Sequence, residues 1–363
     1  MRKKIDLRMI RNLIFFILLI VITFWFIFKD QSLEDLVNNI KSANIFYLIL
    51  GALLMLGYHL TESHNVRCLL HALGERKISL PKALKFTLIG FFFSSITPAA
   101  TGGQPIEIYY MTKENISGPK ATMSSLIILC GFQISTIALG IICAILNPST
   151  LKGGLIWIYL IGITINGAAL FFLLVCVFSQ KLTKKTTDLF MLILKKLKIK
   201  NLDKKRMEIE KGLKKYNKSS EFIKTHMNEF IKAIIRGFIQ IIFYYSVPYC
   251  IYKALGLNSY NFFQFFTMQA VLFTTVSALP LPGSVGISET IFLKIFENAF
   301  GKNLISASML LSRGVTFYLY VIISLIVVVT NAIKMKNAKG EIDKKVKIIE
   351  KENLYTRELK EAI

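Results

Sequence analysis

The stretch "SSITPAATGGQPIE", Ser94 to Glu107, lies between two strongly apolar runs, "LIGFFF" (88–93) upstream and "LIILCGF" (126–132) downstream. It contains two prolines, two adjacent glycines and a carboxylate, which a continuous membrane helix rarely carries. Irregular backbone at membrane depth is tolerated only where it is buried in protein or lines a water-filled cavity. The stretch therefore predicts a specialised element within a membrane-embedded chain.

The composition supports a membrane protein, because 53% of the residues are apolar and the mean hydropathy is +0.52. Two apolar regions, 84–110 and 262–300, are interrupted by Pro/Gly features. The continuous apolar runs cover 13–28, 45–61, 121–146, 155–178, 230–254 and 304–333. This pattern predicts an all-α polytopic membrane protein with about six full spans and two broken elements.

The formal net charge of +23 comes largely from loops beside the apolar runs, as the positive-inside rule produces. No nucleic-acid recognition module accompanies these basic loops, so we expect no nucleic-acid partner. The basic N-terminus, the segment 179–229 and the basic tail are predicted to lie in the cytoplasm; 179–229 holds fifteen Lys/Arg against six acidic residues. The run 13–28 has no small-residue cleavage site after it, which favours an uncleaved signal anchor. The Lys-, Ile- and Asn-rich usage is typical of a low-GC bacterium, so we expect a multi-pass protein of the bacterial cytoplasmic (inner) membrane.

Span parity decides how the broken regions enter the membrane. With the basic segments inside, region 84–110 begins and ends in the cytoplasm, whereas region 262–300 begins and ends outside. We therefore predict two re-entrant or paired broken-helix elements that enter from opposite faces. The predicted organisation is a first membrane half 1–178, a basic cytoplasmic linker 179–229 with an interfacial helix at 186–200, a second membrane half 230–335 and a basic cytoplasmic tail 336–363.

The two broken regions resemble each other in sequence. "SITPAATGGQPIE" (Ser95–Glu107) and "SALPLPGSVGISE" (Ser277–Glu289) both fit S-x-x-P-x(8)-E, and each holds two prolines and two glycines. Two Pro/Gly-rich breaks can match by chance, but opposite entry directions are what an inverted-topology repeat predicts. The hypothesis is that the two breaks together line a polar cavity near the bilayer midplane.

These motifs and the segment "RCLLHALG" (67–74) resemble the membrane domain of the lysylphosphatidylglycerol synthases, also called multiple peptide resistance factors, and its stand-alone flippase-like relatives. The resemblance covers roughly residues 5–335. Many relatives carry an arginine shortly after the first glutamate, where this chain has Tyr109 and Tyr110. The residues that carry the resemblance are Pro98, Gly102, Gly103 and Glu107 in the first motif, Pro280, Pro282, Gly283, Gly286 and Glu289 in the second, and Arg313 in the last span.

Glu107, Glu289 and Arg313 are the candidate site residues for a lipid or a proton. A carboxylate at membrane depth is costly unless it is paired, hydrated or protonated, so such residues often mark pathways. The alternative is that each glutamate caps a half-helix or forms a structural pair. Arg313 is expected either to pair with Glu289 or to grip a lipid phosphate bidentately. Arg67 is a second-tier candidate that can also act as an interfacial anchor.

The glycines and prolines of the motifs are candidates for the helix breaks and for anion binding by the backbone. Prolines 98, 280 and 282 interrupt the helices. Glycines 102, 103, 283 and 286 allow unusual backbone conformations and let a helix N-terminus approach an anion such as a phospholipid headgroup. A packing role for small residues in membrane helices is the alternative.

The cysteines and histidines do not predict a cofactor. The five cysteines contain no C-x-x-C, so we expect no disulfide framework. His64, Cys68 and His71 would share one helical face, but without a carboxylate partner this spacing is weak support for a metal site. We therefore predict no metal, no cofactor and no catalytic residue.

The leading functional hypothesis is a phospholipid flippase or translocase. The resemblance implies anionic lipids, phosphatidylglycerol or lysyl-phosphatidylglycerol, a link to cationic peptide (antibiotic) resistance, and a homo-oligomer as one possible state. No G-x-x-x-x-G-K-[ST] motif is present, so transport against a gradient would need proton or ion coupling at Glu107 or Glu289. Passive scrambling is the other possibility.

Two alternatives stay open. The family includes phosphatidylglycerol lysyltransferases, which use aminoacyl-tRNA and carry the transferase chemistry in a separate soluble domain. The longest polar segments of this chain, about fifty and thirty residues, are too short to bury the core of such a domain, so we expect no lysyl transfer from this chain alone. A non-catalytic partner that presents lipid to another protein is also compatible with the sequence.

Overall fold

The computed structural model describes residues 33–75, 78–97, 100–179, 185, 217–218, 220–277, 284 and 286–334. Within these residues the chain is helical and contains no strand. The predicted span 13–28, the predicted interfacial helix at 186–200 and the motif residues Pro98, Pro280, Pro282 and Gly283 lie outside them.

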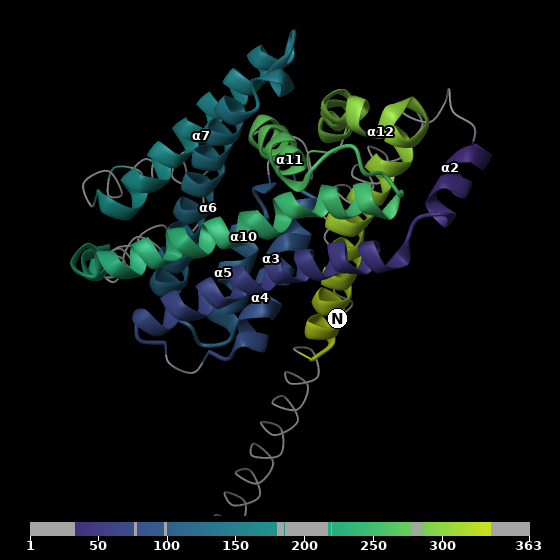
Figure 1. The fold of residues 1–363 in the computed structure, drawn as a ribbon. Helices are drawn as coiled ribbons and strands as arrows, with labels where there is room; N and C mark the ends of the chain where they lie inside the picture. The colour runs from purple at the N-terminus through teal and green to yellow at the C-terminus, as the bar shows by residue number, and fades with distance from the viewer. Residues whose placement is uncertain are drawn as a thin grey trace, which may run out of the picture.

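Five described helices are long and apolar enough to cross a membrane, which confirms the polytopic all-α fold (Figure 1). They are α3 (Ile45–Ala72), α6 (Gly118–Leu146), α7 (Leu155–Phe178), α10 (Met227–Ala254), and α12 (Ile287–Arg313), which continues through the π-helical turn η4 (Gly314–Tyr318) to residue 334. Shorter elements are α2 (Leu33–Lys41), α4 (Leu80–Ser95), α5 (Gly103–Lys113), η2 (Pro148–Leu151) and α11 (Phe262–Val276).

Helix α3 is longer than its apolar run predicts. The run ends at residue 61, but the helix continues to Ala72, so Arg67 lies in its last turns instead of following the span. The reason is that polar residues of this part are buried against protein: Asn65 is 1% exposed and its side chain donates to the carbonyl of Ala233 in α10 (3.2 Å). A hydropathy window cannot distinguish such buried polar groups from a loop.

The two halves of the chain have matching helices at a constant displacement of 182 residues. Helix α3 begins at 45 and ends at 72, and α10 begins at 227 and ends at 254. Helix α4 begins at 80 and α11 at 262. The left-handed Gly74 (φ 88°) after α3 corresponds to Gly256 (φ 76°) after α10. This is strong support for an internal repeat.

Helix α12 combines two elements of the predicted topology. Its backbone leaves the helical region at Gly301 (φ 71°), so residues 287–300 form the second limb of the broken element and 302–334 form the last span. A left-handed φ favours glycine, since a Cβ is disfavoured in that conformation. The kink therefore lies at a residue that suits it.

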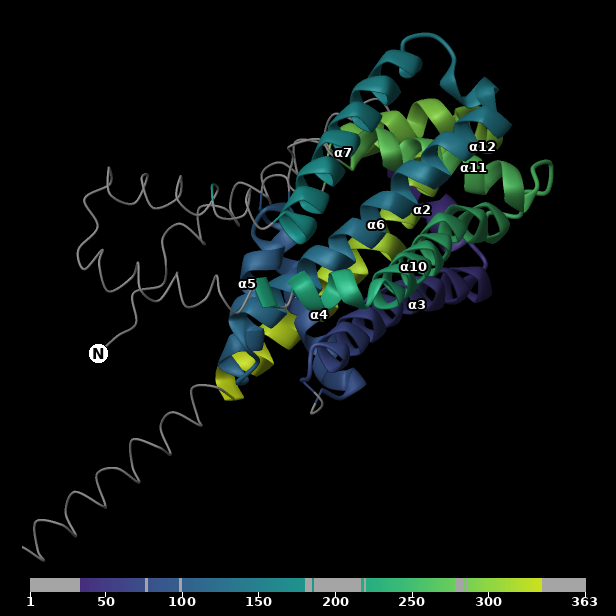
Figure 2. The same ribbon diagram turned by 90° about the vertical axis from the view of Figure 1, so that its left-hand side faces the viewer.

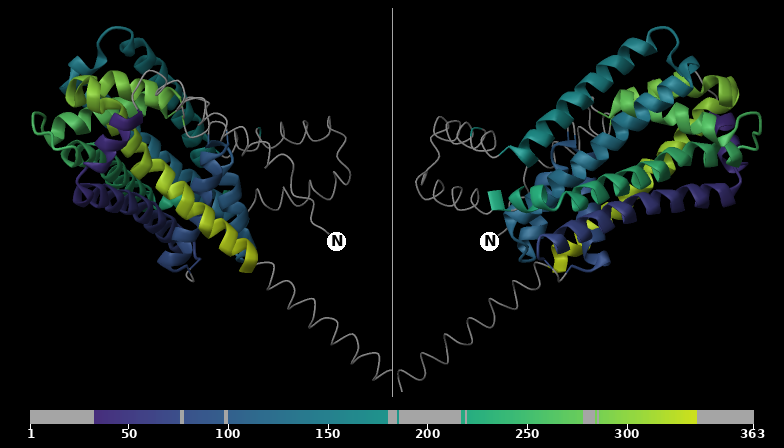
Figure 3. Two further views of the ribbon diagram at one scale, coloured as in Figure 1. Left: turned by 90° about the vertical axis from the view of Figure 1, so that its right-hand side faces the viewer. Right: turned by 60° about the vertical axis from the view of Figure 1, so that its left-hand side comes forward.

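The two broken elements lie at opposite ends of the long helices. Figure 2 shows α4 and α5 at one end of the bundle, and α11 with the beginning of α12 at the other. Helices α3 and α10 lie side by side between them (Figure 3). Opposite placement is the geometry that an inverted-topology repeat requires.

Helices α6 and α10 approach each other backbone to backbone. A Cβ added at Gly131 of α6 would lie 2.9 Å from the carbonyl oxygen of Ala233, and one at Gly237 would lie 2.8 Å from that of Gly131. Small residues allow this approach, as is usual between membrane helices. With the displacement of 182, position 131 in the first half corresponds to Arg313 in the second.

Candidate functional site

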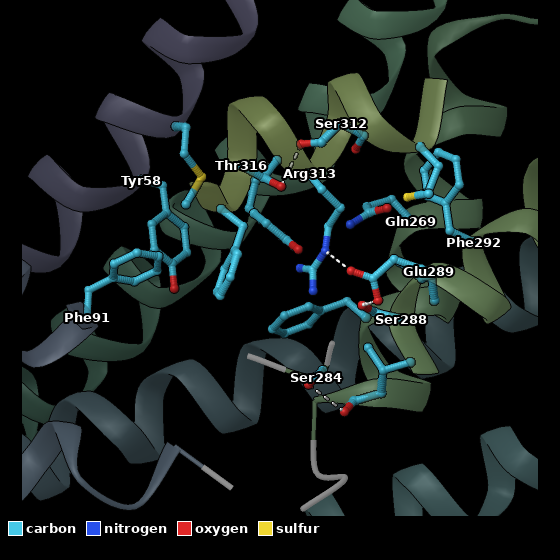
Figure 4. A pocket seen from close by; sticks show the side chains of 17 residues that line it. Tyr58, Phe91, Gln269, Ser284, Ser288, Glu289, Phe292, Ser312, Arg313 and Thr316 are labelled. Atoms are coloured by element: carbon cyan, nitrogen blue, oxygen red, sulfur yellow. Dashed lines mark hydrogen bonds and ion pairs between the residues drawn. The ribbon is translucent and has the colours of Figure 1, made fainter. Parts of the chain in front are cut away.

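A cavity of about 160 Å³ lies between the two halves of the chain. Figure 4 shows the side chains that line it; among the described elements they come from α3, α4, α10, α11, α12 and η4, and from Ser284. Both halves therefore build one cavity. Its aromatic walls are formed by Tyr58, Phe91, Tyr244, Phe273, Phe292 and Phe317.

An ion pair between Glu289 and Arg313 forms the charged part of the lining (Figure 4). The Arg313 Nε lies 2.7 Å from Glu289 Oε1, and the glutamate side chain is only 1% exposed. The guanidinium carbon also lies 4.7 Å from the ring centre of Phe317, within cation–π range. This confirms the predicted proximity of Glu289 and Arg313.

Glu289 also caps helix α12. Its Oε2 accepts hydrogen bonds from the backbone N–H of Gly286 (2.7 Å) and the hydroxyl of Ser288 (2.8 Å). Gly286 has φ 93°, so this position favours a glycine. Capping and charge pairing, considered separately from the sequence, are thus performed by one carboxylate, and each of its oxygens has a donor.

Glu107 has very different surroundings. It is 3% exposed and packs against Gly90 of α4, where an added Cβ would lie 3.2 Å from its Oε2. Within the described residues no hydrogen bond or ion pair joins its carboxylate to another group. Of the described residues in 94–107, none lines the cavity, so the two motif glutamates are not brought together there.

The glycines of the two motifs serve different purposes. Gly102 has an ordinary φ of −80°, and an added Cβ would lie 2.6 Å from the Thr97 side chain. A Cβ at Gly103 would overlap the Ser94 hydroxyl and lie 2.8 Å from the Gly90 carbonyl. In the first motif the glycines therefore allow close packing of α4 and α5, whereas unusual backbone is needed at Gly286.

Two titratable residues of α3 are not among the sequence-predicted candidates. Glu62 accepts a hydrogen bond from the Gln240 side chain (3.3 Å) and interacts electrostatically with Glu107. His59 is fully buried, and neither ring nitrogen has a partner in the described chain. Both were missed because the apolar run ends at residue 61, which makes this part of the chain resemble the start of a loop. The repeat could have signalled it, since its displacement relates Glu62 to Tyr244 inside the second half's span.

Arg67 and the His/Cys pattern lie at the end of α3, away from the cavity lining. Arg67 is half-buried, and its Nε has no partner among the described residues. His64 Nε2 lies 3.4 Å from Cys68 Sγ, while His71 Nε2 contacts the carbonyl of Ile78 (2.9 Å). No group of three potential metal ligands converges in the part of the chain that the structure describes.

The family model of the lysylphosphatidylglycerol synthase TM region matches residues 13–324. The chain belongs to this family. A UPF0104 membrane protein of Archaeoglobus fulgidus is 26% identical over 322 residues, which cover 87% of this chain and 96% of the relative. The lysylphosphatidylglycerol synthase TM region thus includes both halves of the repeat and the Glu289–Arg313 pair. Membership agrees with a lipid-related, multi-pass membrane protein.

Proposed function

We propose that the protein moves phospholipid between the two leaflets and that the lipid headgroup binds in the cavity beside Arg313. The observation that carries the proposal is a buried guanidinium that faces a cavity built by both halves (Figure 4). A guanidinium presents a planar fork of N–H donors that matches a phosphate, and Glu289 engages its Nε. A phosphodiester headgroup is the anion that a membrane supplies in quantity.

The cavity also offers an acceptor to the headgroup. The Oε1 of Gln269 lines the cavity side of α11, is buried, and has no hydrogen-bond partner in the described chain. A buried acceptor without a donor costs about 1–3 kcal/mol, so a ligand that donates there gains affinity. A phosphate on Arg313 together with a hydroxyl or amine on Gln269 describes a polar phospholipid headgroup, and phosphatidylglycerol is such a lipid.

The size of the cavity fits a headgroup and not a whole lipid. At about 30 Å³ for each water, about 160 Å³ is the room of roughly five waters. The acyl chains would remain in the bilayer. With segment 179–229 in the cytoplasm, α4–α5 would enter from that face and α11–α12 from the other, which suits a site reached alternately from both leaflets.

Reconstitution tests the proposal. The purified full-length chain is placed in vesicles with headgroup-labelled phosphatidylglycerol, and the label in each leaflet is followed with a membrane-impermeant quencher. We expect faster exchange than in protein-free vesicles, and a loss of at least about tenfold in Arg313→Gln, the effect of removing a charge-assisted contact of about 1.4 kcal/mol or more. Lys294→Gln, at an exposed position of the same helix, is the matched control and should exchange lipid normally.

Two results would contradict the proposal. One is exchange no faster than in protein-free vesicles, and the other is normal exchange by Arg313→Gln. Formation of lysyl-lipid from charged tRNA by the same purified chain would favour the transferase alternative instead.

A further inference from the structure

We propose that Glu62 and Glu107 form a proton-binding site in the first half, separate from the headgroup cavity. The site deepens the proposed function and rests on it in one respect, namely that a bound proton would couple lipid movement to the proton gradient. The existence of the site can be tested without any transport measurement.

The geometry places two carboxylates together with no cation between them. Glu107 is 3% exposed and has no hydrogen bond or ion pair in the described chain. Glu62 interacts electrostatically with it and has one donor, the amide of Gln240, whose residue is 2% exposed. Two like charges at such a site cannot both remain ionised without a counter-ion, so one proton is expected to be shared.

The repeat explains why the first half lacks a counter-charge. In the second half, Arg313 neutralises Glu289. The corresponding position in the first half is Gly131, and an added Cβ there would lie only 2.9 Å from the backbone of α10. No side chain of any size fits at that position, so a cation must come from elsewhere.

The cations on the surrounding helices are engaged with other partners. Lys85 of α4 pairs with Glu114, and Lys120 of α6 pairs with Glu75 (3.1 Å). The Arg236 guanidinium of α10 donates to the Asn65 side chain (3.3 Å). The remaining ionisable groups are Tyr110 on α5, Tyr58 and Arg67 on α3, and Tyr244 on α10; Arg67 lies more than one helical turn beyond Glu62 and forms no ion pair with it in the described chain.

His59 is a second, independent observation that points to a proton. Its ring is 0% exposed, both nitrogens lack partners in the described chain, and it lies one turn before Glu62 on α3. A buried imidazole without partners is costly, and it is rare in native structures. Its ring contacts Tyr58 (5.1 Å between ring centres) and Phe91 (4.9 Å), both of which line the headgroup cavity. His59 is thus placed between the cavity and the carboxylates.

A proton fits this site better than a larger cation. Glu62, His59 and Glu107 do not line the described cavity, so no space for an ammonium group is shown beside them. No group of three metal-ligating residues converges within the described residues, whereas a sodium or divalent ion requires several oxygen ligands. A proton needs only the two carboxylates.

Infrared spectroscopy of the full-length protein in vesicles tests the site directly. At neutral pH we expect a carboxylic-acid C=O band from the shared proton. The double variant Glu62→Gln/Glu107→Gln should lose this band, and each single variant should weaken or shift it. Glu289→Gln is the matched control and should keep the band, because Glu289 is ionised against Arg313.

The outcomes separate this proposal from the proposed function. An unchanged band in the double variant, or no such band in the parent protein, overturns the proton site whatever the transport assay shows. Size-exclusion profiles and helical circular dichroism verify that the variants fold, and Glu107→Asp, which keeps a carboxyl group, should retain a band. A sodium-dependent change in the carboxylate bands without any pH dependence would also overturn the proposal.

Discussion

The first and second halves share a backbone plan, yet their key glutamates differ in every contact. Glu289 has an arginine, a hydroxyl and a backbone N–H as partners, whereas Glu107 has none in the described chain and lies near a second carboxylate. One position accounts for much of the difference, since the first half has Gly131 where the second has Arg313. A repeat can thus conserve a fold while dividing two tasks between its copies.

Arg313→Met should have the largest effect on the comparison, because it makes the second half resemble the first. Removing one member of a buried ion pair leaves the other charge uncompensated, which typically costs about 3–5 kcal/mol. We expect a loss of that size in the free energy of unfolding, measured by denaturant titration in detergent micelles. Arg313→Lys should recover part of it, since a charge remains. Equal stability of the methionine variant and the parent would show that the pair is not structurally important.

Replacing each glutamate by glutamine tests the asymmetry from the other side. Glu289→Gln keeps an acceptor for Gly286 and Ser288 but removes the charge facing Arg313, so we expect a loss of about 2–3 kcal/mol. Glu107→Gln removes an unpaired buried carboxylate, and its stability should stay within about 1 kcal/mol of the parent or rise. The same titration measures both variants. Similar losses in the two variants would contradict the difference between the halves.

Much of the fold could be predicted from the sequence. Apolar runs and charge parity locate the five described spans and both broken elements, because hydropathy and positive loops reflect the bilayer directly. The end of α3 could not be found this way, because Asn65 and neighbouring polar residues are buried in protein. The displacement of 182 residues between Glu107 and Glu289, applied to the whole half, would have extended α3 to Ala72.

The candidate site was less predictable than the fold. The Glu289–Arg313 pair could be proposed, since both residues are charged and lie near a helix break. The cavity could not, because it depends on α3 and α10 lying side by side. The role of Gly131 is also invisible in one sequence, because a glycine signals a missing side chain only after the symmetry-related Arg313 is known.

Gly103 tests the close packing that is specific to the first broken element. The second half has Val285 at the corresponding position. An added Cβ at Gly103 would meet the Ser94 hydroxyl and the Gly90 carbonyl, so Gly103→Ala should destabilise the protein by about 1–3 kcal/mol. Gly167→Ala is the control, because nothing lies within 4 Å of its added Cβ in α7, and a helical alanine should be neutral or stabilising by up to about 1 kcal/mol. Thermal unfolding of both variants measures the contrast, and equal effects would refute the packing role.

The caps of the two entering helices provide the smallest test. Asn261 forms a capping box with Gln264 at the start of α11, with both hydrogen bonds at 2.9 Å. Ser79, 182 residues earlier at the start of α4, makes no side-chain capping bond. Asn261→Ala should therefore cost about 1 kcal/mol, whereas Ser79→Ala should change the free energy of unfolding by no more than about 0.5 kcal/mol. If the two substitutions cost the same, then the caps do not distinguish the halves, and the asymmetry is confined to the buried charges.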